Sequence, residues 1–311
     1  MTEACLFCGA PTRAYLEGVV DNRFGSPGSY RVLACDACGG RQTSPRPDGP
    51  TLKALYEAHY NYGGKTDGAY SAAREKFLFS PFYRLLLAVD GDISFHGRAG
   101  SGRLLDIGCN EGRGLELYRR NGFAADGLEL NANAARVARA RGFTVHETLI
   151  EDFAPPAPYD VAVLSNVLEH ALDPRDMLRH VKRVLKPGGE VWISLPNADS
   201  ALAARYRAAW VNWHVPFHIV HFSQARLHRL LAEEGFAIRE STAITPALWV
   251  AQSWIANRWR GDMAAVVRLQ RKAPLVAAAM LVARGLLFPL LAFWNRTGRG
   301  DCLIVRAKAG A

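Results

Sequence analysis

The sequence predicts an α/β protein built on a doubly wound sheet. Residues 104–107 form a short apolar run of the kind that buried parallel strands use. A tight turn over residues 108–112 follows, helical periodicity begins at Leu115, and residues 124–130 are predicted to form a second strand. Strand, glycine-containing turn, helix and strand in this order are the repeating unit of doubly wound sheets.

Length and composition fit this prediction and exclude other classes. The 311 residues can hold one large domain with appendages, and 49% hydrophobic with 22% charged residues indicate a folded chain. The first residues contain neither a basic nor an apolar leader segment, so we expect a cytoplasmic protein. The net charge of +9 is concentrated in residues 245–299, where eight lysines and arginines accompany one acid, Asp262. Such a local excess argues against a nucleic-acid-binding face on the fold.

The residues of the glycine turn favour one class of ligand. Glycines let a ligand approach the backbone closely, and a helix start offers unpaired N–H groups. Asp106 stands two residues before Gly108, where its charge would repel a pyrophosphate and attract the ammonium of an amino-acid group. Glu129, about 20 residues beyond the turn, can hold ribose hydroxyls. These residues point to S-adenosylmethionine (SAM), which carries an amino acid, a sulfonium and a ribose but no phosphate.

The turn resembles motif I of class I SAM-dependent methyltransferases, with Asn110 in place of the usual glycine, as in some sugar methyltransferases. Residues 149–153 resemble the family's acidic turn that meets the adenine amine, and residues 159–170 resemble its motif IV. The resemblance covers residues 100–245 and 300–308 and implies a Rossmann-like sheet that binds SAM. Asp152 could instead be an ordinary helix-starting acid, and the glycine turn could belong to another α/β protein. The SAM-binding candidates are Asp106, Gly108, Cys109, Asn110, Gly112, Glu129, Leu130, Asp152, Ser165 and Asn166.

Three histidines are candidate catalytic residues. His170 lies one helical turn beyond the strand that ends at Ser165, and His218 and His221 lie in an aromatic stretch before a helix that Ser223 can cap. A histidine here could act as a general base or bind a substrate hydroxyl. Packing or cofactor positioning is an equal alternative for His170. A metal site among the three histidines of the aromatic stretch, His214, His218 and His221, is the least favoured interpretation, because no acid or cysteine completes one nearby in the sequence.

Two Cys-x-x-Cys pairs, Cys5 with Cys8 and Cys35 with Cys38, occupy the N-terminal segment. Each pair can form a tight knuckle that directs two thiolates at one tetrahedral ion, so we expect a structural zinc ribbon over residues 1–47. A knuckle without metal and a redox pair are the alternatives. The ribbon resembles the N-terminal appendage of bacterial methyltransferases in surface-sugar and secondary-metabolite pathways.

A helical linker or cap is expected over residues 48–102. Its tyrosines at positions 60, 62 and 70 could cap the cofactor site or simply pack on the core. Residues 74–90 are predicted to form a helix whose apolar residues face inward.

An insertion between the predicted strands 236–244 and 302–307 distinguishes this chain. It is far too long for a turn, and it contains four tryptophans, the basic excess and an apolar run over residues 273–294. We expect two antiparallel helices, about 246–260 and 264–294, that bind an anionic membrane surface peripherally. A helical lid packed on the domain is the alternative.

The sequence therefore predicts a SAM-binding domain over residues 103–245 and 300–311, with residues 246–299 as its insertion. The expected function is methyl transfer from SAM to a small-molecule or lipid-linked acceptor such as a sugar, with one structural zinc. A non-catalytic scaffold that keeps the SAM fold is one alternative. A nucleic-acid methyltransferase is a weaker one, because Asn166 is followed by Val167 and not by the Pro-Pro-aromatic motif of amine-methylating enzymes. We therefore expect no nucleic-acid partner.

Overall fold

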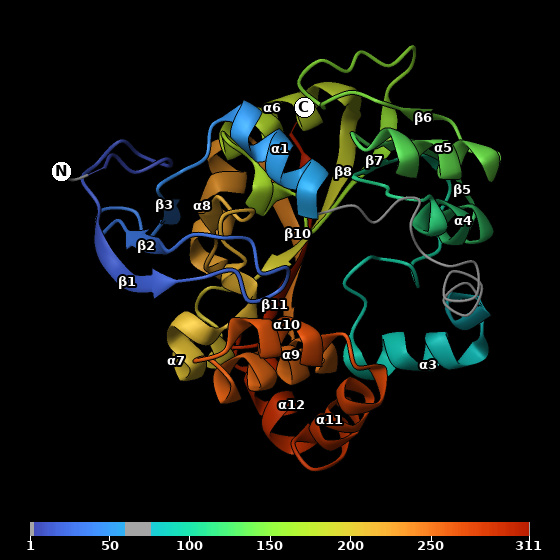
Figure 1. Cartoon of the computed structure of the whole chain (residues 1–311). Coiled ribbons are helices and arrows are strands. Elements are labelled where there is room, and N and C mark those ends of the chain that lie inside the picture. The colour runs from blue at the N-terminus through green and yellow to red at the C-terminus, as the bar shows by residue number, and fades with distance from the viewer. Residues whose placement is uncertain (1–2, 60–75, 311) are drawn as a thin grey trace.

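The computed structural model describes residues 3–59 and 76–310 and is built around a seven-stranded sheet (Figure 1). The strand order is β10-β11-β8-β7-β4-β5-β6. Strands β8, β7, β4, β5 and β6 are parallel, whereas β11 is antiparallel to both β8 and β10. This arrangement confirms the predicted fold class. The strands and their covering helices are β4 (Gly102–Ile107), α4 (Arg113–Arg120), β5 (Phe123–Leu128), α5 (Ala132–Ala140), β6 (Val145–His146), β7 (Tyr159–Ser165), α6 (Pro174–Val184), β8 (Leu185–Pro196), α8 (Gln224–Glu233), β10 (Phe236–Ile244) and β11 (Cys302–Ala309).

Each face of the sheet has its own apolar core. Leu105 of β4 packs in a cluster with residues of α6 and α8, whereas its neighbour Leu104 packs with residues of α4 and α5. Both leucines are fully buried. Because successive strand residues point to opposite faces and both faces are covered, the central strands are continuous apolar runs.

The winding of the chain places a ligand site between β4 and β7. From β4 the chain proceeds to β5 and β6 on one side, and from β7 it proceeds to β8 on the other. In such sheets ligands bind beyond the carboxyl ends of the strands at the point where the winding reverses. The residues that follow Ile107 in β4 and Ser165 in β7 are therefore placed at this point.

The N-terminal ribbon shares its sheet and its core with the rest of the chain. Strands β1 (Arg13–Val19), β2 (Tyr30–Ala34) and β3 (Arg41–Ser44) form an antiparallel sheet that β9 (Val220–His221) extends. Phe7 of the first knuckle belongs to the main core cluster, and its ring centroid lies 5.4 Å from that of Phe222. The ribbon is thus a built-in part of the fold.

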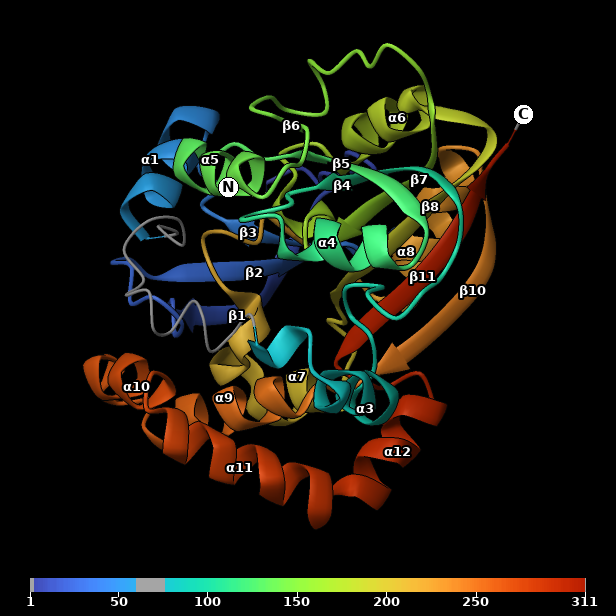
Figure 2. The same ribbon diagram turned by 90° about the vertical axis from the view of Figure 1, so that its right-hand side faces the viewer.

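The insertion forms four helices, whereas the sequence analysis expected two. Pro274 and Pro289 lie in the first turns of the third and fourth helices. Proline is tolerated there because the N–H groups of a first turn make no hydrogen bond within the helix. The last two helices are bent by 69° relative to each other and lie below the sheet (Figure 2). The four helices are α9 (Ala247–Arg258), α10 (Met263–Gln270), α11 (Ala273–Gly285) and α12 (Phe288–Arg296).

Over the described part of the chain, no single helix combines the length and the hydropathy needed to cross a membrane. Only α11 and α12, taken as a bent pair, meet those two criteria together.

The helix expected over residues 74–90 is also different from the prediction. The described helix α3 (Pro81–Asp90) begins with Pro81, and the Ser80 side chain caps it. Its apolar residues do not face inward as expected, because the large side chains of Phe77, Phe82, Leu85 and Val89 are exposed. The candidate capping tyrosines at positions 60, 62 and 70 lie outside the described residues.

Candidate functional site

A cavity of about 350 Å³ lies at the carboxyl ends of β4 and β7. Its volume falls within the range of small-ligand sites. Its walls come from the turn after β4, the end of β7 and the segment that precedes β4. Six of the ten predicted SAM-binding residues line it: Asp106, Gly108, Cys109, Asn110, Ser165 and Asn166.

The turn after β4 depends on two residues with left-handed backbone. Gly108 has a φ of 77°, and Asn110 has a φ of 52°. Asparagine is among the few non-glycine residues that tolerate this region, which accounts for Asn110 at a position where the family usually has glycine. A Cβ atom at Gly114 would be tightly packed, because it would lie 3.0 Å from His96 Nε2 and 3.3 Å from Asp106 Oδ2. The backbone at the start of α4 can therefore approach these two groups closely.

Asp106 is a buried acid in the wall of the cavity, beside the Glu111–Arg113 ion pair. The side chain is buried, and burial, followed by the neighbouring charge of Glu129, raises its pKa to about 7. A buried carboxyl of this kind ionises more readily when a cation is placed beside it. The residue is thus suited to hold an ammonium group inside the cavity.

Glu129, directly after β5, fixes the turn from the other side. Its Oε2 accepts a hydrogen bond from the Asn110 N–H at 2.8 Å, and its Oε1 accepts one from the Asn131 N–H at 2.7 Å. Burial raises its pKa. The carboxylate therefore lies against the glycine turn, as expected for a ribose-binding acid, although it does not line the cavity itself.

Three other predicted residues are not part of the cavity wall. Gly112 starts α4 with a φ of 73°, and a Cβ atom there would lie 2.8 Å from the Ala138 Cβ, so this glycine serves helix packing. Leu130 and Asp152 are exposed. For these two residues a role in SAM binding stays a prediction.

Sequence reasoning missed the wall that precedes β4. Tyr83 of α3 and His96 line the cavity, and the Tyr83 hydroxyl lies 2.8 Å from His96 Nδ1. Burial lowers the pKa of His96 to about 4, so its ring is neutral. Tyr118 donates a hydrogen bond to the Ser94 carbonyl at 2.6 Å and closes the same wall. The recognised motifs begin at residue 103. In the loop before them, His96 and Ser94 are the polar residues from which this wall could have been predicted.

A second polar cluster, which we call the junction site, consists of Tyr56, Glu169, His170 and His218. Glu169 and His170 lie in the short helical turn after β7, His218 precedes β9, and Tyr56 comes from α1 (Gly49–His59). One donor atom from each of Glu169, His170 and His218 lies within 4.8 Å of the others. The Tyr56 hydroxyl is 2.7 Å from His170 Nδ1. Three segments far apart in the sequence therefore meet where the ribbon joins the sheet.

The hydrogen bonds of the junction site constrain the protonation of its two histidines. His170 Nδ1 is 3.0 Å from the Phe217 carbonyl oxygen, and His218 Nδ1 is 2.9 Å from that of Asn212. A carbonyl oxygen only accepts, so the His218 Nδ1 carries the proton and its Nε2 keeps a lone pair. The His170 Nδ1 faces both a carbonyl, which only accepts, and the Tyr56 hydroxyl, which can donate or accept, so the orientation of that hydroxyl sets the His170 tautomer. Burial lowers the pKa of His170 to about 4 and lowers that of His218 as well. Both rings are thus neutral near pH 7.

Glu169 is the unusual member of the cluster. It is only 1% exposed, and neither carboxyl oxygen has a hydrogen-bond partner among residues 3–59 and 76–310. Burial raises its pKa to about 8. His218 is buried beside it, with Nε2 3.8 Å from Glu169 Oε1, whereas His170 is partly exposed. His170 is therefore the member of the cluster that a second ligand can reach.

The side chains of Glu169, His170 and His218 also have the chemistry of metal ligands. One carboxylate and two imidazoles suit a divalent metal ion. The sequence argument against a metal among the histidines relied on the absence of a nearby acid. That argument is wrong, because folding brings Glu169 to within 3.8 Å of His218.

His221 lies in a different environment from the other two candidate histidines. Its Nε2 is 3.0 Å from the Thr43 hydroxyl of β3, and its ring packs at right angles on Trp213. Thr43 in turn donates a hydrogen bond to the His218 carbonyl. The position of His221 links the ribbon to the sheet, and its catalytic role stays a prediction.

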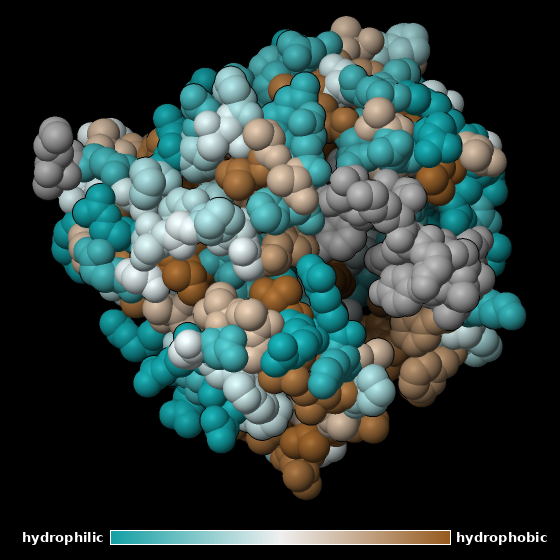
Figure 3. All heavy atoms as spheres, viewed as in Figure 1, coloured by the Kyte–Doolittle hydropathy of each residue, from teal (hydrophilic) through white to brown (hydrophobic). Residues whose placement is uncertain are grey.

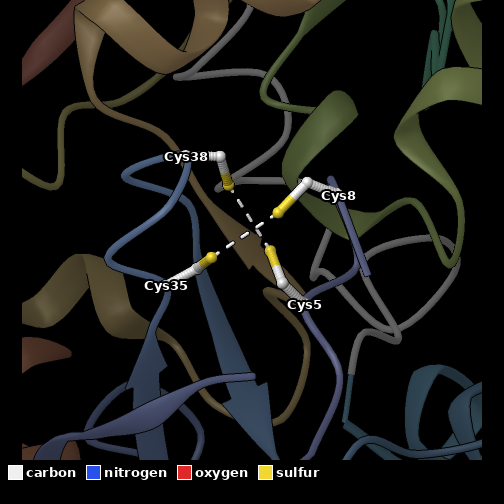
Figure 4. Close-up of side chains that lie close together, drawn as sticks. All are labelled: Cys5, Cys8, Cys35 and Cys38. Atoms are coloured by element: carbon white, nitrogen blue, oxygen red, sulfur yellow. Dashed lines mark hydrogen bonds between the residues drawn. The ribbon is translucent and has the colours of Figure 1, made fainter. Parts of the chain in front are cut away.

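The four N-terminal cysteines converge as their spacing predicts (Figure 4). All four Sγ atoms lie within 4.8 Å of one another, with Cys5 and Cys38 at 3.5 Å and Cys8 and Cys35 at 3.6 Å. Zinc–sulfur bonds of about 2.3 Å in a tetrahedron place the sulfur atoms about 3.8 Å apart. All four are free thiols, so the donor set fits one structural metal ion.

Comparison with known proteins gives the family. A family model described as a methyltransferase domain matches residues 74–241, more than half of the chain. The chain belongs to this methyltransferase family. The match begins before Tyr83 and His96 and ends in β10, so the family domain of this methyltransferase contains the cavity and three members of the junction site, Glu169, His170 and His218. The fourth member, Tyr56 of α1, precedes the matched residues.

The relatives of this methyltransferase include enzymes named ubiquinone biosynthesis O-methyltransferase. The one from Sodalis glossinidius is 35% identical over 104 residues, which cover 31% of this chain and 42% of that protein. The one from Thiobacillus denitrificans is 31% identical over 157 residues, which cover 46% of this chain and 68% of that protein. The chain thus spans less than half the length of the first of these relatives.

Solved structures support the fold alone. A chain from a complex of the Haloferax volcanii Trm112 methyltransferase activator with a methyltransferase aligns with a TM-score of 0.51 at 16% identity, over 84% of this chain and 98% of that chain. SpnF, described as a 4+2 cyclase, aligns with a TM-score of 0.51 at 18% identity, over 86% of this chain and 97% of that chain. Because a cyclase shares this fold, the fold by itself does not define the reaction.

Proposed function

We propose that the chain transfers the methyl group of SAM to the oxygen of a small-molecule or lipid-linked acceptor. The observation that carries this proposal is the buried carboxyl of Asp106 in a cavity of suitable size at the switch point of a methyltransferase-family sheet. The names of the relatives, which contain O-methyltransferase, support oxygen as the acceptor atom.

The cavity residues bind and orient the donor. Asp106 would hold the ammonium, the N–H groups at the start of α4 would be offered to the carboxylate of the amino-acid part, and Glu129 would hold the ribose hydroxyls. When bound, SAM supplies an activated methyl group on its sulfonium. The task left to the chain is to align an acceptor for in-line attack and to remove its proton.

The junction site is suited to the acceptor. His170 carries a lone pair on Nε2 when the Tyr56 hydroxyl accepts from its Nδ1, stays neutral down to about pH 4 and is partly exposed. It can therefore accept the proton of an acceptor hydroxyl. Tyr56 and the Phe217 carbonyl hold its ring in place, and Glu169 and His218 stand behind it. We assign His170 as the base and Glu169 and His218 as positioning residues.

The cysteine cluster is assigned a structural zinc ion. Four thiolates would complete a tetrahedral coordination sphere, so this ion would take no part in the reaction. Its role would be to hold the ribbon, and through the pairing of β3 with β9 it would also hold the segment that carries His218.

A scaffold that keeps the fold without catalysis is the competing function, because the fold by itself does not define a reaction. The test is incubation with SAM labelled on its methyl group in two fractions of cell extract, polar metabolites and lipid-linked glycans. A labelled product in either fraction, absent with heat-treated protein, supports the proposal. SAM binding by calorimetry without any labelled product would favour the scaffold.

A further inference from the structure

One surface of the molecule exposes large apolar side chains that nothing in the described residues covers. They lie on the outer side of α11 and α12, where Leu286 is 80% and Leu281 is 68% exposed. Figure 3 shows them as a hydrophobic region at the lower edge of the molecule. The exposed residues of this pair are Leu281, Val282, Leu286, Leu287, Phe288, Leu290 and Phe293.

Helix α3 continues the same surface. Asp90 at its end forms an ion pair with Arg284 of α11 at 2.6 Å, and α3 lies beside α11 and α12 in both ribbon views (Figures 1 and 2). Phe82, Leu85 and Val89 of α3 are also exposed. We call the exposed residues of α3, α11 and α12 the apolar face.

The apolar face is not simply the outside of an amphipathic bundle. The inner side of α11 and α12 is already apolar and buried, through Val276, Ala283 and Leu291. A surface helix of a protein in water normally presents polar residues on its other side. Contiguous exposed apolar area of this kind indicates a surface that is covered by something else.

The basic residues around the apolar face indicate which kind of partner covers it. Arg271 and Lys272 precede the apolar run, Arg296 and Arg299 follow it, and all four are exposed. Across residues 245–299 the single acid is Asp262. A second copy of the chain would bring two basic borders together, and their repulsion opposes such a dimer. An anionic lipid surface instead satisfies both the apolar side chains and the basic border, and Trp254 and Trp259 add the aromatic residues typical of a bilayer interface.

We propose that the apolar face binds peripherally to an anionic membrane surface, with Leu286 and Phe288 inserted and the arginine border on the lipid headgroups. The lid that the sequence analysis kept as an alternative would have buried these side chains against the domain, and they are exposed.

Helix α3 links this surface to the donor cavity. Its exposed side carries Phe82 and Leu85, whereas Tyr83 lines the cavity and contacts His96. A membrane-bound chain therefore holds its cavity one helix away from the lipid. The closeness of cavity and lipid favours lipid-linked acceptors over freely soluble ones, and this inference about the acceptor rests on the proposed methyl transfer. The proposed binding to lipid does not rest on methyl transfer.

Flotation of the full chain with vesicles tests the proposal. The probes are phosphatidylcholine vesicles with and without phosphatidylglycerol. The chain is expected to float with the anionic vesicles, less so at high salt, since the basic border is screened. The variant Leu286→Glu with Phe288→Glu should lower the partition coefficient at least roughly tenfold on both vesicle types. The variant Arg271→Gln with Lys272→Gln should lower it roughly tenfold on the anionic vesicles only.

Controls make each outcome decisive. Leu149→Glu changes an exposed leucine outside the apolar face and should float like the unchanged chain. SAM affinity, measured on every variant, confirms that the fold is intact. Absence of flotation by the unchanged chain, or equal flotation by the Leu286 and Phe288 variant, would overturn the proposal. A dimer in solution that this variant abolishes would also overturn it and would make the face an interface between copies. Failure to find a methylated product would leave the flotation result unaffected.

Discussion

The donor cavity and the junction site differ in how the chain builds them. The cavity uses one continuous segment, residues 106–114, together with the end of β7 and the loop before β4. The junction site joins Tyr56, the Glu169–His170 pair and His218. The hydrogen bond from the Ile219 N–H to the Glu169 carbonyl, the pairing of β3 with β9 and the packing of α1 bring these segments together. The first site is defined by local backbone and charge. The second depends on contacts between distant segments, and so it should be the more sensitive of the two to changes elsewhere in the fold.

The largest expected effect separates the two sites directly. Replacing the assigned base, His170→Gln, should lower turnover at saturating SAM by roughly 10²- to 10⁴-fold, because general base catalysis contributes about that much. SAM affinity should not change. Labelled methyl transfer and calorimetry measure the two quantities on one preparation.

The matched control for this change is His228→Gln, since His228 contacts Ser241 and lies in α8, outside both sites. It should leave turnover unchanged. If the His170 variant lost as much SAM affinity as turnover, the donor cavity and the junction site would act as one site. That result would contradict their separate roles.

Removal of the ribbon metal should damage the junction site more than the cavity. Cys5→Ser breaks the cysteine cluster, so the metal content should fall from about one ion per chain to none, and the unfolding temperature should fall by several degrees. Turnover should fall with it, because the ribbon strand β3 pairs with the strand that follows His218. SAM affinity should stay within about twofold. Elemental analysis, thermal unfolding and calorimetry provide the three readouts.

Asp36→Ala, in the second knuckle of the same cysteine cluster, is the control, because Asp36 is an exposed partner of Arg13 and such surface pairs contribute little. Two metal ions per chain, one of them retained after Cys5→Ser, would place a metal on Glu169, His170 and His218 and replace the base assignment.

The donor cavity itself is tested by Asp106→Asn. Loss of one charge-assisted contact to the ammonium should cost about 1.5–3 kcal/mol, which corresponds to a roughly 10- to 150-fold weaker binding of SAM. Asp160→Asn is the matched control, since Asp160 lies at the opposite end of β7 and pairs with Lys186. Equal SAM affinity of the two variants would remove Asp106 from the site.

The smallest predicted effect is the pH dependence of SAM binding. The pKa of Asp106 in the free chain is raised to about 7, and an ammonium beside it favours the charged form and so lowers that pKa in the complex. Binding therefore releases a proton below pH 7, and affinity should rise by up to about tenfold per pH unit as the pH increases toward 7. Above about pH 7 the affinity should level off, and it should fall again as the pH passes the pKa of an α-amino group, about 7.7–8.0, because the ammonium then loses its charge. Calorimetry in two buffers measures the released proton, and Asp106→Asn should abolish the dependence.

Features that depend on local sequence could be predicted, whereas features that depend on contacts between distant segments could not. The doubly wound α/β sheet and the convergence of the four cysteines are confirmed, because each follows from local apolar runs or local spacing. The helical breaks at Pro274 and Pro289 were missed, although both prolines are visible in the sequence. Tyr83 and His96 were missed because they precede the first strand of the motif.

The junction site could not be predicted, because nothing in the spacing of Glu169 and His218 indicates that they meet. The sequence also could not show that the apolar side of α3 is exposed. An apolar helix such as Phe82–Val89 looks the same in sequence whether its face is turned toward a core or toward a membrane.

The central claim is that one site binds the donor and the other prepares the acceptor. The most direct test is the initial rate of labelled methyl transfer as a function of SAM concentration, for Asp106→Asn and His170→Gln beside the unchanged chain. The account predicts that a high SAM concentration restores the rate of the Asp106 variant to nearly that of the unchanged chain, whereas the His170 variant stays slow at every concentration. Recovery of the His170 variant at high SAM, or no recovery of the Asp106 variant, would contradict it.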